Sequence, residues 1–485
     1  MKNSIKHILQ ISVISCAFMF ACEDFEETNT NPNQPEDVPR GYLFTYAVET
    51  IMDQVYGGFD NSRVGMTLAQ YWSQNQYTEE SRYQYRPATN NTTWNTIYTG
   101  IYNLQEIIRL NEEDELTGSD NEIAIATIMQ VWTYQFLTDL YGDIPYENAL
   151  LAKQDTLAPA YSRQQDIYPD LLRRLRAARD MIDVAAPGFA SGDIIYDGDM
   201  ELWRKFANSL MLRVAIRMVD RMEQESLAAI TEAYTSGVFE DYTETAQINY
   251  LASQPATNPL YVDVIVGNRN DFSSSNTLID VLLARNDPRI NAYFAPAKNS
   301  GQFIGRPYGQ NAAAANALVP DAVSQLSAKI LSPDLPGLIM DAAEVKFILA
   351  EAVQRGAALG KTAADFYGEG IRESMEYWEV ATPAQIDNYI LANPYDAGNW
   401  KQSLGVQKWI ALYMQGFQGW AEYRRLDFTG ILKMPVSGPL VSINQVPVRR
   451  TYPPDEQTLN RQNYITAIEK QGPDELTTKV WWDLF

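Results

Sequence analysis

Apolar residues recur every three or four positions through most of the chain, the spacing that places them on one face of an α-helix. One such stripe runs from Ile125 to Leu140, and others occupy 167–182, 203–218, 345–352, 367–378 and 406–420. Several neighbouring stripes are joined by short polar turns, as in an array of helical hairpins. Because no repeat of fixed length is present, the pattern alone predicts a mainly α-helical fold, either a bundle or a degenerate solenoid.

Long stretches without this periodicity separate the stripes. Loops of such length inside a compact domain are usually either functional or disordered. These stretches are rich in aromatic and polar residues, so we expect them to be ordered. They span 71–95, 250–276, 295–336 and 430–464.

The first 40 residues have a different character. A basic beginning, MKNSIKH, precedes an apolar run at 8–21 that is too short to cross a bilayer, which is typical of a secretory signal peptide. The run ends in Ala21-Cys22, which resembles a bacterial lipobox, where the cysteine is lipidated. Cys16 fits the strict lipobox spelling better, but it would leave an apolar core of only about seven residues. We therefore favour Cys22 over Cys16.

The sequence thus predicts a lipoprotein signal peptide at 1–21, a flexible acidic tether at 22–40 and a single helical domain at 41–485. Residues 23–40 are acidic and rich in Asn and Pro, as expected of a tether. An ordinary secreted protein with one stray cysteine remains the alternative at this point. A lone free thiol is a liability in an oxidising compartment, which favours acylation of Cys22.

Charge and composition exclude several function classes. The 485 residues include 38 Lys and Arg against 61 Asp and Glu, so a nucleic acid would be repelled. The single histidine, His7, lies in the predicted signal peptide, and the mature chain retains one cysteine. Ser-His-Asp, Cys-His and HExxH zinc chemistry are therefore excluded. We expect neither a cofactor nor a metal.

Weaker motifs have structural interpretations. "GAALGKT" (356–362) lacks the spacing of a phosphate loop and follows a helix, so it predicts a helix C-cap and turn. "DGDMEL" (197–202) has Leu202 where a calcium loop needs glycine, so its acids are expected to cap the following helix. Glu344 and Glu351 are expected to be solvated or salt-bridged, because nothing places them in a cleft.

The most informative loop is 71–94, in which aromatic residues make up a quarter of the positions, with Asn, Gln and Arg interleaved. Sugar rings stack on aromatic faces, and planar amides or guanidinium groups can bracket their hydroxyls. A peptide backbone would also suit these groups, and simple packing on helices is an equally weighted alternative. Candidate ligand-binding residues in this loop are Trp72, Tyr77, Tyr83 and Tyr85 for stacking, and Asn75 and Arg82 for polar contacts. The loop 267–276 is second, through Arg269, Asn270 and Asp271, and Tyr308 is third.

An ordered series of motifs across nearly the whole mature chain resembles the SusD/RagB family of Bacteroidota outer-membrane lipoproteins, particularly its SusD-like branch. The motifs are "NTNPN" in the tether, "YGDIPY" (141–146), "GDMELWRKFANSLMLRVAIRM" (198–218), "NDPR" (286–289), "AEVKFILAEAVQRG" (343–356), "QKWIALYMQGFQGWAEYRR" (407–425), "RRTYPPDEQTLNRQNY" (449–464) and "TKVWWD" (478–483).

The resemblance implies a scaffold of four tetratricopeptide-like helix pairs, with loops and small β-hairpins forming a ligand face. It assigns the pairs to roughly 96–140, 165–220, 341–380 and 402–424. It also implies a non-enzymatic lipoprotein of the cell surface, which captures oligosaccharides or peptides as the lid of a SusC-type TonB-dependent transporter. The acids after Cys22 resemble the export signal of such lipoproteins. A helical-repeat adaptor that binds only protein, and a carboxylate-based glycosidase, are the rival hypotheses.

Overall fold

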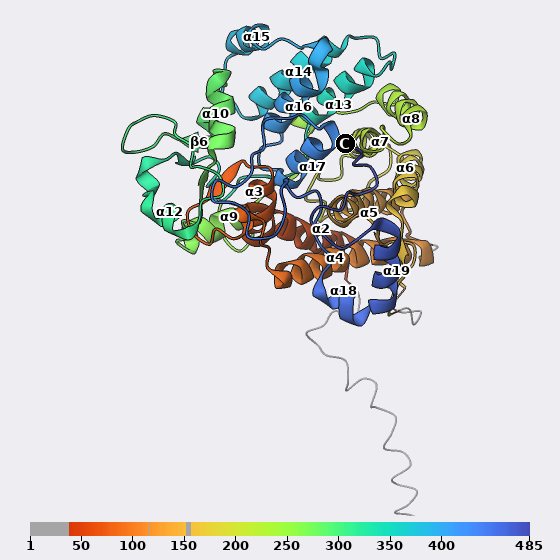
Figure 1. Cartoon of the computed structure of the whole chain (residues 1–485). Helices are drawn as coiled ribbons and strands as arrows, with labels where there is room; N and C mark the ends of the chain where they lie inside the picture. The colour runs from red at the N-terminus through yellow and green to blue at the C-terminus, as the bar shows by residue number, and fades with distance from the viewer. Residues whose placement is uncertain (1–37, 115, 152–156) are drawn as a thin grey trace, which may run out of the picture. The chain divides into compact units, whose positions relative to one another are not determined.

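The computed structural model describes residues 38–114, 116–151 and 157–485, and Gly41–Phe485 form one compact unit. The predicted signal peptide, both cysteines and nearly all of the predicted tether lie outside the described residues. Figure 1 shows that helices dominate this unit, as the hydrophobic pattern predicts.

Each helix pair that the family resemblance assigns is present. Short loops join the two helices of three pairs, and a longer loop joins α6 to α7. The pairs are α4 (Pro87–Glu113) with α5 (Asp120–Tyr141), α6 (Gln164–Met181) with α7 (Met200–Arg217), α13 (Ala342–Gln354) with α14 (Ala363–Tyr377), and α16 (Trp400–Ala411) with α17 (Gly416–Leu426).

Further helices cover this scaffold or lie in its loops. They are α2 (Arg40–Tyr56), α3 (Met66–Leu68), α8 (Glu223–Thr235), α9 (Pro259–Tyr261), α10 (Asn276–Ala284), α11 (Ile290–Tyr293), α12 (Ala312–Ala317), α15 (Pro383–Ala392), α18 (Pro454–Leu459) and α19 (Arg461–Gln471). Two short π-helices, η2 (Gly58–Gly65) and η6 (Val262–Val266), interrupt the regular structure, and 3₁₀ turns span Glu80–Arg82, Tyr242–Glu244, Pro320–Ala322 and Ala397–Asn399.

The strands form small two-stranded antiparallel sheets between segments that are mostly far apart in the sequence. Their pairings are β1 (Trp72–Gln74) with β5 (Phe272–Ser274), β2 (Ile144–Pro145) with β3 (Tyr161–Ser162), β4 (Ala246–Ile248) with β8 (Gly337–Met340), and β6 (Phe294–Ala295) with β7 (Gln325–Leu326).

Local sequence explains where the scaffold helices begin and end. The Asp199 carboxylate accepts hydrogen bonds from the backbone of Glu201 and Leu202, so "DGDMEL" contains a helix cap, as predicted. Thr362 and Asp365 form a reciprocal capping box at the start of α14. Between α13 and α14, Gly356 has φ +105°, which L side chains rarely adopt, so "GAALGKT" is the predicted C-cap and turn.

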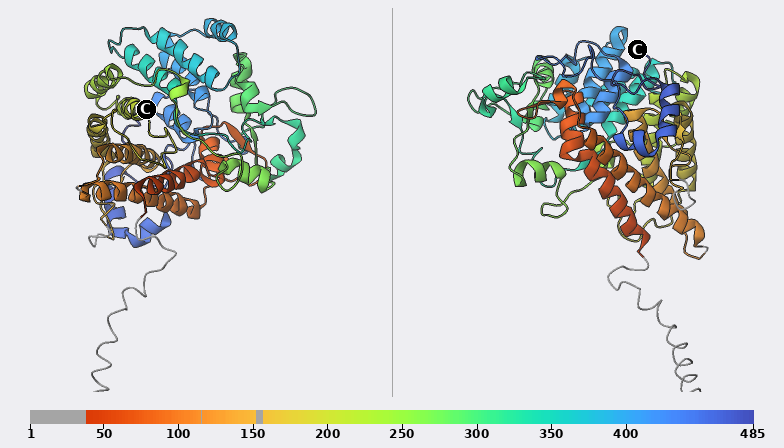
Figure 2. Two further views of the ribbon diagram at one scale, coloured as in Figure 1. Left: turned by 180° about the vertical axis from the view of Figure 1, so that it is seen from behind. Right: turned by 60° about the horizontal axis from the view of Figure 1, so that its bottom comes forward.

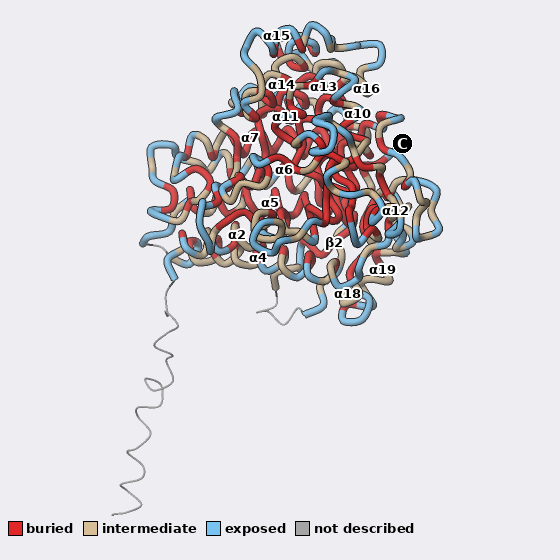
Figure 3. The backbone as a smooth tube through the Cα atoms, turned by 90° about the vertical axis from the view of Figure 1, so that its left-hand side faces the viewer, coloured by how far each residue is buried: buried red, intermediate tan, exposed pale blue. Residues whose placement is uncertain are grey.

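The scaffold helices contact one another in chain order. α4 packs on α5, α5 on α6, α6 on α7, and α7 on α13, which also contacts α14 and α16. The views in Figure 2 let this succession be followed around the unit. Figure 3 shows buried backbone running through the helices, with exposed residues at their outer turns. The apolar stripes provide this core, and residues such as Trp203, Leu210 and Trp409 have no exposed surface.

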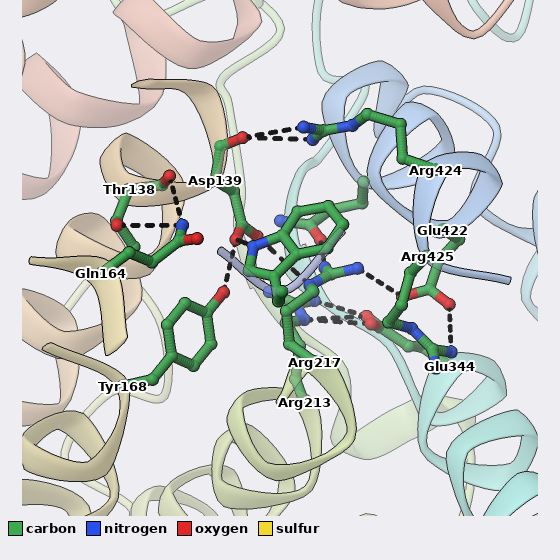
Figure 4. Close-up of polar contacts among 12 residues, drawn as sticks. Thr138, Asp139, Gln164, Tyr168, Arg213, Arg217, Glu344, Glu422, Arg424 and Arg425 are labelled. Carbon is green, nitrogen blue, oxygen red and sulfur yellow. Dashed lines mark hydrogen bonds and ion pairs between the residues drawn. The ribbon is translucent and has the colours of Figure 1, made fainter. Parts of the chain in front are cut away.

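Buried ion pairs join the scaffold helices near the centre (Figure 4). Arg217 on α7 donates to Glu422 on α17 at 2.6 Å, and Arg425 donates to the other oxygen of Glu422 at 2.7 Å. Arg213 on α7 donates to Glu344 on α13 at 2.5 Å. Removing one partner of such a pair would strand a buried charge, which is strongly destabilising.

The helix-borne carboxylates Glu344 and Glu351 belong to this network. Arg425 and Arg355 both donate to Glu351, so of the two expected environments the salt-bridged one is correct and the solvated one is wrong. Burial alone would raise the pKa of Glu344, but Arg213 and Lys408 hold it below its ordinary value. Both carboxylates therefore stay ionised and engaged, and the structure offers no basis for a catalytic acid at either position.

Candidate functional site

The first- and second-choice ligand loops lie side by side, although almost 200 residues separate them. Strand β1 pairs with β5, so that Trp72 faces Ser274 and Gln74 faces Phe272. Beyond the strands, the backbone N–H of Asn75 donates to the carbonyl of Asp271 at 2.7 Å. The Asn75 side chain donates to Asn270 Oδ1 at 2.8 Å. Asn75 and Asn270 therefore hold the two loops together.

Asp271 anchors the polar side of this junction. Its buried carboxylate accepts hydrogen bonds from Arg63 at 2.5 Å, from Arg269 at 2.7 Å and from Gln76 at 2.5 Å. Arg63 comes from the π-helix η2, so one carboxylate fixes three segments of the chain. Hydrogen bonds between charged groups are the strongest kind, and such a junction is rigid.

Tyr77 projects from this junction and is half exposed, with 49% of its surface accessible. Three guanidinium groups approach its ring, from Arg63 at 5.1 Å, Arg269 at 5.8 Å and Arg86 at 5.9 Å from the ring centroid. Arg63 also lies 5.2 Å from the ring centroid of Phe59, which is equally exposed. We call Phe59, Arg63, Tyr77, Arg86 and Arg269 the Tyr77 cluster.

A hollow of about 680 Å³, which we call the first hollow, adjoins the Tyr77 cluster. Its walls come from the C-terminal end of α2, the start of η2, the first turns of α4 and the η6 region. The volume falls in the range of small-molecule sites. The lining residues are Asp53, Gln54, Gly57, Gly58, Phe59, Asp60, Arg86, Ala88, Thr89, Thr92, Pro255, Thr257, Pro259, Val262 and Asp263.

The two π-helices approach each other closely at this hollow. A Cβ atom on Gly58 would lie 1.6 Å from a carboxylate oxygen of Asp263, so a side chain at this position would have to displace that carboxylate. A π-helical turn inserts an extra residue and is frequently found at functional sites. Here η2 supplies Phe59 and Arg63, and η6 supplies Asp263.

Burial shifts the pKa values of charged side chains around the first hollow. It raises the pKa of Asp263, which Arg269 and Arg63 partly offset, and it raises the pKa of Asp53, whose carboxylate accepts a hydrogen bond from Tyr250. Burial also lowers the pKa of Arg63, against the effect of Glu80 and Asp271. Acidic and basic side chains therefore lie close together around the first hollow and beside the exposed ring of Tyr77.

This arrangement suits binding rather than bond cleavage. The exposed rings of Tyr77 and Phe59 can cover an apolar sugar face, and Arg86 and Arg269 present N–H donors beside them. Arg86 and Arg269 are themselves held by Glu80 at 3.2 Å and Asp271 at 2.7 Å, which fixes the direction of their remaining donors.

The other predicted stacking residues lie elsewhere. Trp72 has no exposed surface, and its indole N–H donates to Tyr413 at 2.9 Å. Tyr308 is also buried, because it packs beneath the loop that contains Tyr83. This burial corrects the expectation that Trp72 and Tyr308 offer ring faces to a ligand. Aromatic side chains have a large hydrophobic surface, and here the core uses it.

Tyr83, Tyr85 and Arg82 have a different position from Tyr77. Arg82 donates to the carbonyls of Gly438 and Ser437 at 2.8 and 3.2 Å, and so ties two loops together instead of facing solvent. Tyr83 is buried and Tyr85 is partly exposed, and both line another hollow, formed with residues 439–445 and 475–477. Only Tyr77 of the predicted rings lies in the Tyr77 cluster.

Phe59, Arg63, Arg86 and Asp263 were not predicted from the sequence. A π-helical turn inserts a single residue and creates no hydrophobic periodicity, so η2 and η6 cannot be recognised in the sequence. An available signal was the polar interruption "GGFDNSR" (57–63), which holds two glycines, an aromatic residue and an arginine between apolar stretches.

The described part of the chain contains neither a membrane-spanning helix nor a cluster of potential metal ligands. None of its helices combines the length and the hydrophobicity needed to span a bilayer. Within residues 38–485, leaving aside the gaps, His, Cys, Asp and Glu form no group of three or more that could hold a metal ion.

A helical scaffold with a hollow lined by aromatic and polar side chains is consistent with the class of binding proteins. The family described as "Starch-binding associating with outer membrane", SusD-like, matches residues 32–453. The chain therefore belongs to the SusD-like family of non-catalytic binding proteins associated with the outer membrane, which confirms the resemblance noted in the sequence.

Solved structures with the same fold cover nearly all of the chain. A chitin-binding protein is 28% identical with a TM-score of 0.82, over 92% of this chain and all of that one. A SusD homologue from Bacteroides uniformis is 24% identical with a TM-score of 0.80 over the same shares. A chitin-binding SusD homologue from Flavobacterium johnsoniae is 23% identical with a TM-score of 0.79, over 91% and 98%. No curated protein sequence matches significantly.

Proposed function

We propose that this protein captures a glycan in the first hollow, with Tyr77 as the stacking surface and Arg86 and Arg269 as polar contacts. The observation that carries the proposal is the half-exposed Tyr77 ring, held among three guanidinium groups at the edge of a hollow large enough for several sugar rings. The family description supports a glycan, and the chitin-binding relatives favour chitin fragments.

The ligand-binding residues in this proposal are a revised set. Five of the sequence-based candidates are kept. Tyr77 and Arg269 contact the ligand in this proposal, and the residues that support them are Asn75, Asn270 and Asp271. Phe59, Arg86 and Asp263 join them. Trp72 and Tyr308 leave the ligand face, because their side chains are buried.

The rest of the proposed role concerns placement at the cell surface. Lipid chains on Cys22 would anchor the mature protein to the outer membrane, facing outward, and a single acyl chain would be too weak for this. The protein would then deliver its glycan to a SusC-type TonB-dependent transporter and act as its lid. Family membership and the lipobox-like sequence support this role.

A substitution at Tyr77 tests the site. Tyr77→Ala is expected to weaken binding of a chitin hexamer about five- to tenfold, since a stacked ring contributes on the order of 1 kcal/mol beyond the area it covers. Tyr77→Phe keeps the ring and serves as the matched control, with affinity close to wild type. Isothermal titration calorimetry with chitin and starch hexamers measures both variants, and a thermal melt checks folding.

Equal affinity of Tyr77→Ala and wild type would remove the first hollow from the proposal. Binding of a random peptide mixture but of neither hexamer would instead identify a peptide-binding member of the family.

A further inference from the structure

A second hollow, of about 1110 Å³, is lined in part by the segment Tyr83–Tyr85, which directly precedes Arg86. Gln84 and Tyr85 line this second hollow, whereas Arg86 lines the first, and no residue lines both. Its remaining walls are the loop 439–445 and the segment 475–477. It is therefore a separate surface, adjacent to the Tyr77 cluster.

The chemistry of the second hollow differs from that of the first. Asp53, Asp60, Asp263 and Arg86 make the first hollow charged, but Glu475 is the one charged side chain that lines the second. Amides and hydroxyls supply its other polar groups, beside the partly exposed Tyr85 and apolar residues such as Val441 and Ile443. In a chain in which a fifth of the residues are charged, this surface is suited to an uncharged, hydroxyl-rich ligand.

Five polar side chains of this hollow are not used by the fold, although Thr451 accepts from Asn90 and Tyr83 donates to the carbonyl of Lys433. The side chains of Gln84, Ser442, Asn444, Gln445 and Thr477 make no hydrogen bond with other described residues. The backbone of the loop is equally unengaged. The Leu440 N–H donates to the carbonyl of Arg82 at 2.8 Å and the Val448 N–H donates to the carbonyl of Leu476 at 2.8 Å, and these bonds fix the two ends. Between them, the Ile443 N–H donates to the carbonyl of Val441, and the Pro447 carbonyl accepts from the Trp420 indole.

We infer that the second hollow binds an uncharged segment of a glycan, independently of the first hollow. Its fixed loop ends and unengaged N–H groups present donors to sugar hydroxyls, and Tyr85 supplies an apolar surface. Two sites on one chain would hold a long glycan more tightly than either alone, by raising its local concentration. The inference rests on the proposed glycan-binding function and extends it to a second place.

Hydrogen–deuterium exchange at sub-second labelling times tests this inference, because the unbonded N–H groups at 442 and 444–446 exchange rapidly in the free protein. We expect saturating chitin or starch hexamer to slow exchange in peptides covering 439–447 and 474–478. This protection should persist in Tyr77→Ala. It should be lost in the triple variant Gln84→Ala, Asn444→Ala, Gln445→Ala, whose altered side chains are exposed and make no contact needed for folding.

The control Gln462→Ala changes an equally exposed amide on α19 and should leave all protection intact. Protection at 75–77 and 262–271 without protection at 441–446 would overturn the second site and leave the proposed function standing. The absence of protection anywhere would contradict the proposed function itself. Retained glycan protection in the triple variant, combined with loss of a co-purifying membrane protein, would identify the second hollow as a protein-docking surface and overturn the inference.

Discussion

Two aromatic residues of one loop, five positions apart, have opposite roles. Trp72 sits on strand β1 with no exposed surface, and its ring centroid lies 5.5 Å from that of Phe272. Tyr77 lies beyond the strand, with a φ of +53°, and half of its surface is exposed. The aromatic composition of the loop makes both residues candidates for ligand binding. Only the long-range pairing of β1 with β5 shows which of them is buried.

This difference predicts distinct consequences of mutation. Trp72→Ala is expected to lower the free energy of unfolding by roughly 3–5 kcal/mol, because a large buried side chain leaves a cavity. It also leaves the Tyr413 hydroxyl without its indole donor. Urea unfolding followed by circular dichroism measures the change, with Tyr77→Ala as the exposed counterpart that should unfold near the wild-type midpoint. A stable Trp72→Ala with weakened glycan binding would place Trp72 in the ligand site instead.

At the scale of elements, the sequence predicts the scaffold well because each helix satisfies a local rule. The stripe that includes Ile125 and Met129 is buried within α5, and Leu171 and Leu175 are buried within α6. A 3.6-residue period depends only on nearby residues, so it survives without knowledge of the fold. Helix α18 lies inside a stretch expected to be a loop and α19 begins near the end of that stretch. The rule does not find them, because α18 buries none of its residues and α19 buries only Ala467.

The candidate site could be predicted only in part, because long-range contacts build it. The sequence identifies the loop that carries Tyr77 and the loop that carries Arg269. It does not show that Asn75 and Asn270 join them, nor that Arg63 arrives from η2 to share Asp271. Without that contact, Arg63 looks like any polar residue between two apolar segments.

Helix α14 provides an element-scale test of electrostatics through Glu373. This buried carboxylate accepts a hydrogen bond from the backbone N–H of Tyr242 at 2.7 Å. Burial raises the pKa of Glu373 to about 7, although Lys346 opposes the shift. The folded protein therefore holds a proton that the unfolded chain has released between the ordinary value of 4.5 and about 7. Stability from this group is present below pH 4.5 and is lost as pH rises through 7.

Glu373→Gln keeps the shape and the acceptor for Tyr242 but carries no charge. We expect it to be more stable than wild type at pH 8, with the difference disappearing near pH 4.5. Urea unfolding across this pH range measures the effect, and Glu469→Gln, at an exposed position on α19, is the matched control. A Glu373→Gln protein that is less stable than wild type at pH 8 would show that the ionised carboxylate is stabilised in the fold.

For the whole molecule, the proposed membrane anchor depends on one cysteine outside the described residues. Cys22→Ser is expected to abolish lipidation and to leave a full-length precursor, because the acyl chains and the start of the mature protein both depend on this cysteine. Cys16→Ser is the matched control and should leave both properties unchanged. Fractionation and mass spectrometry of the mature N-terminus decide between them. Lipidation that survives Cys22→Ser and is lost in Cys16→Ser would move the anchor to Cys16.

We propose above all that the Tyr77 cluster and the first hollow form a glycan-binding site on a SusD-like scaffold. A crystal structure of the mature protein soaked with a chitin hexamer tests this most directly. We predict a sugar ring stacked on Tyr77, with its hydroxyl or acetamide groups within hydrogen-bond distance of Arg86 or Arg269. A hexamer ordered elsewhere on the protein, with the first hollow filled only by water, would contradict the claim.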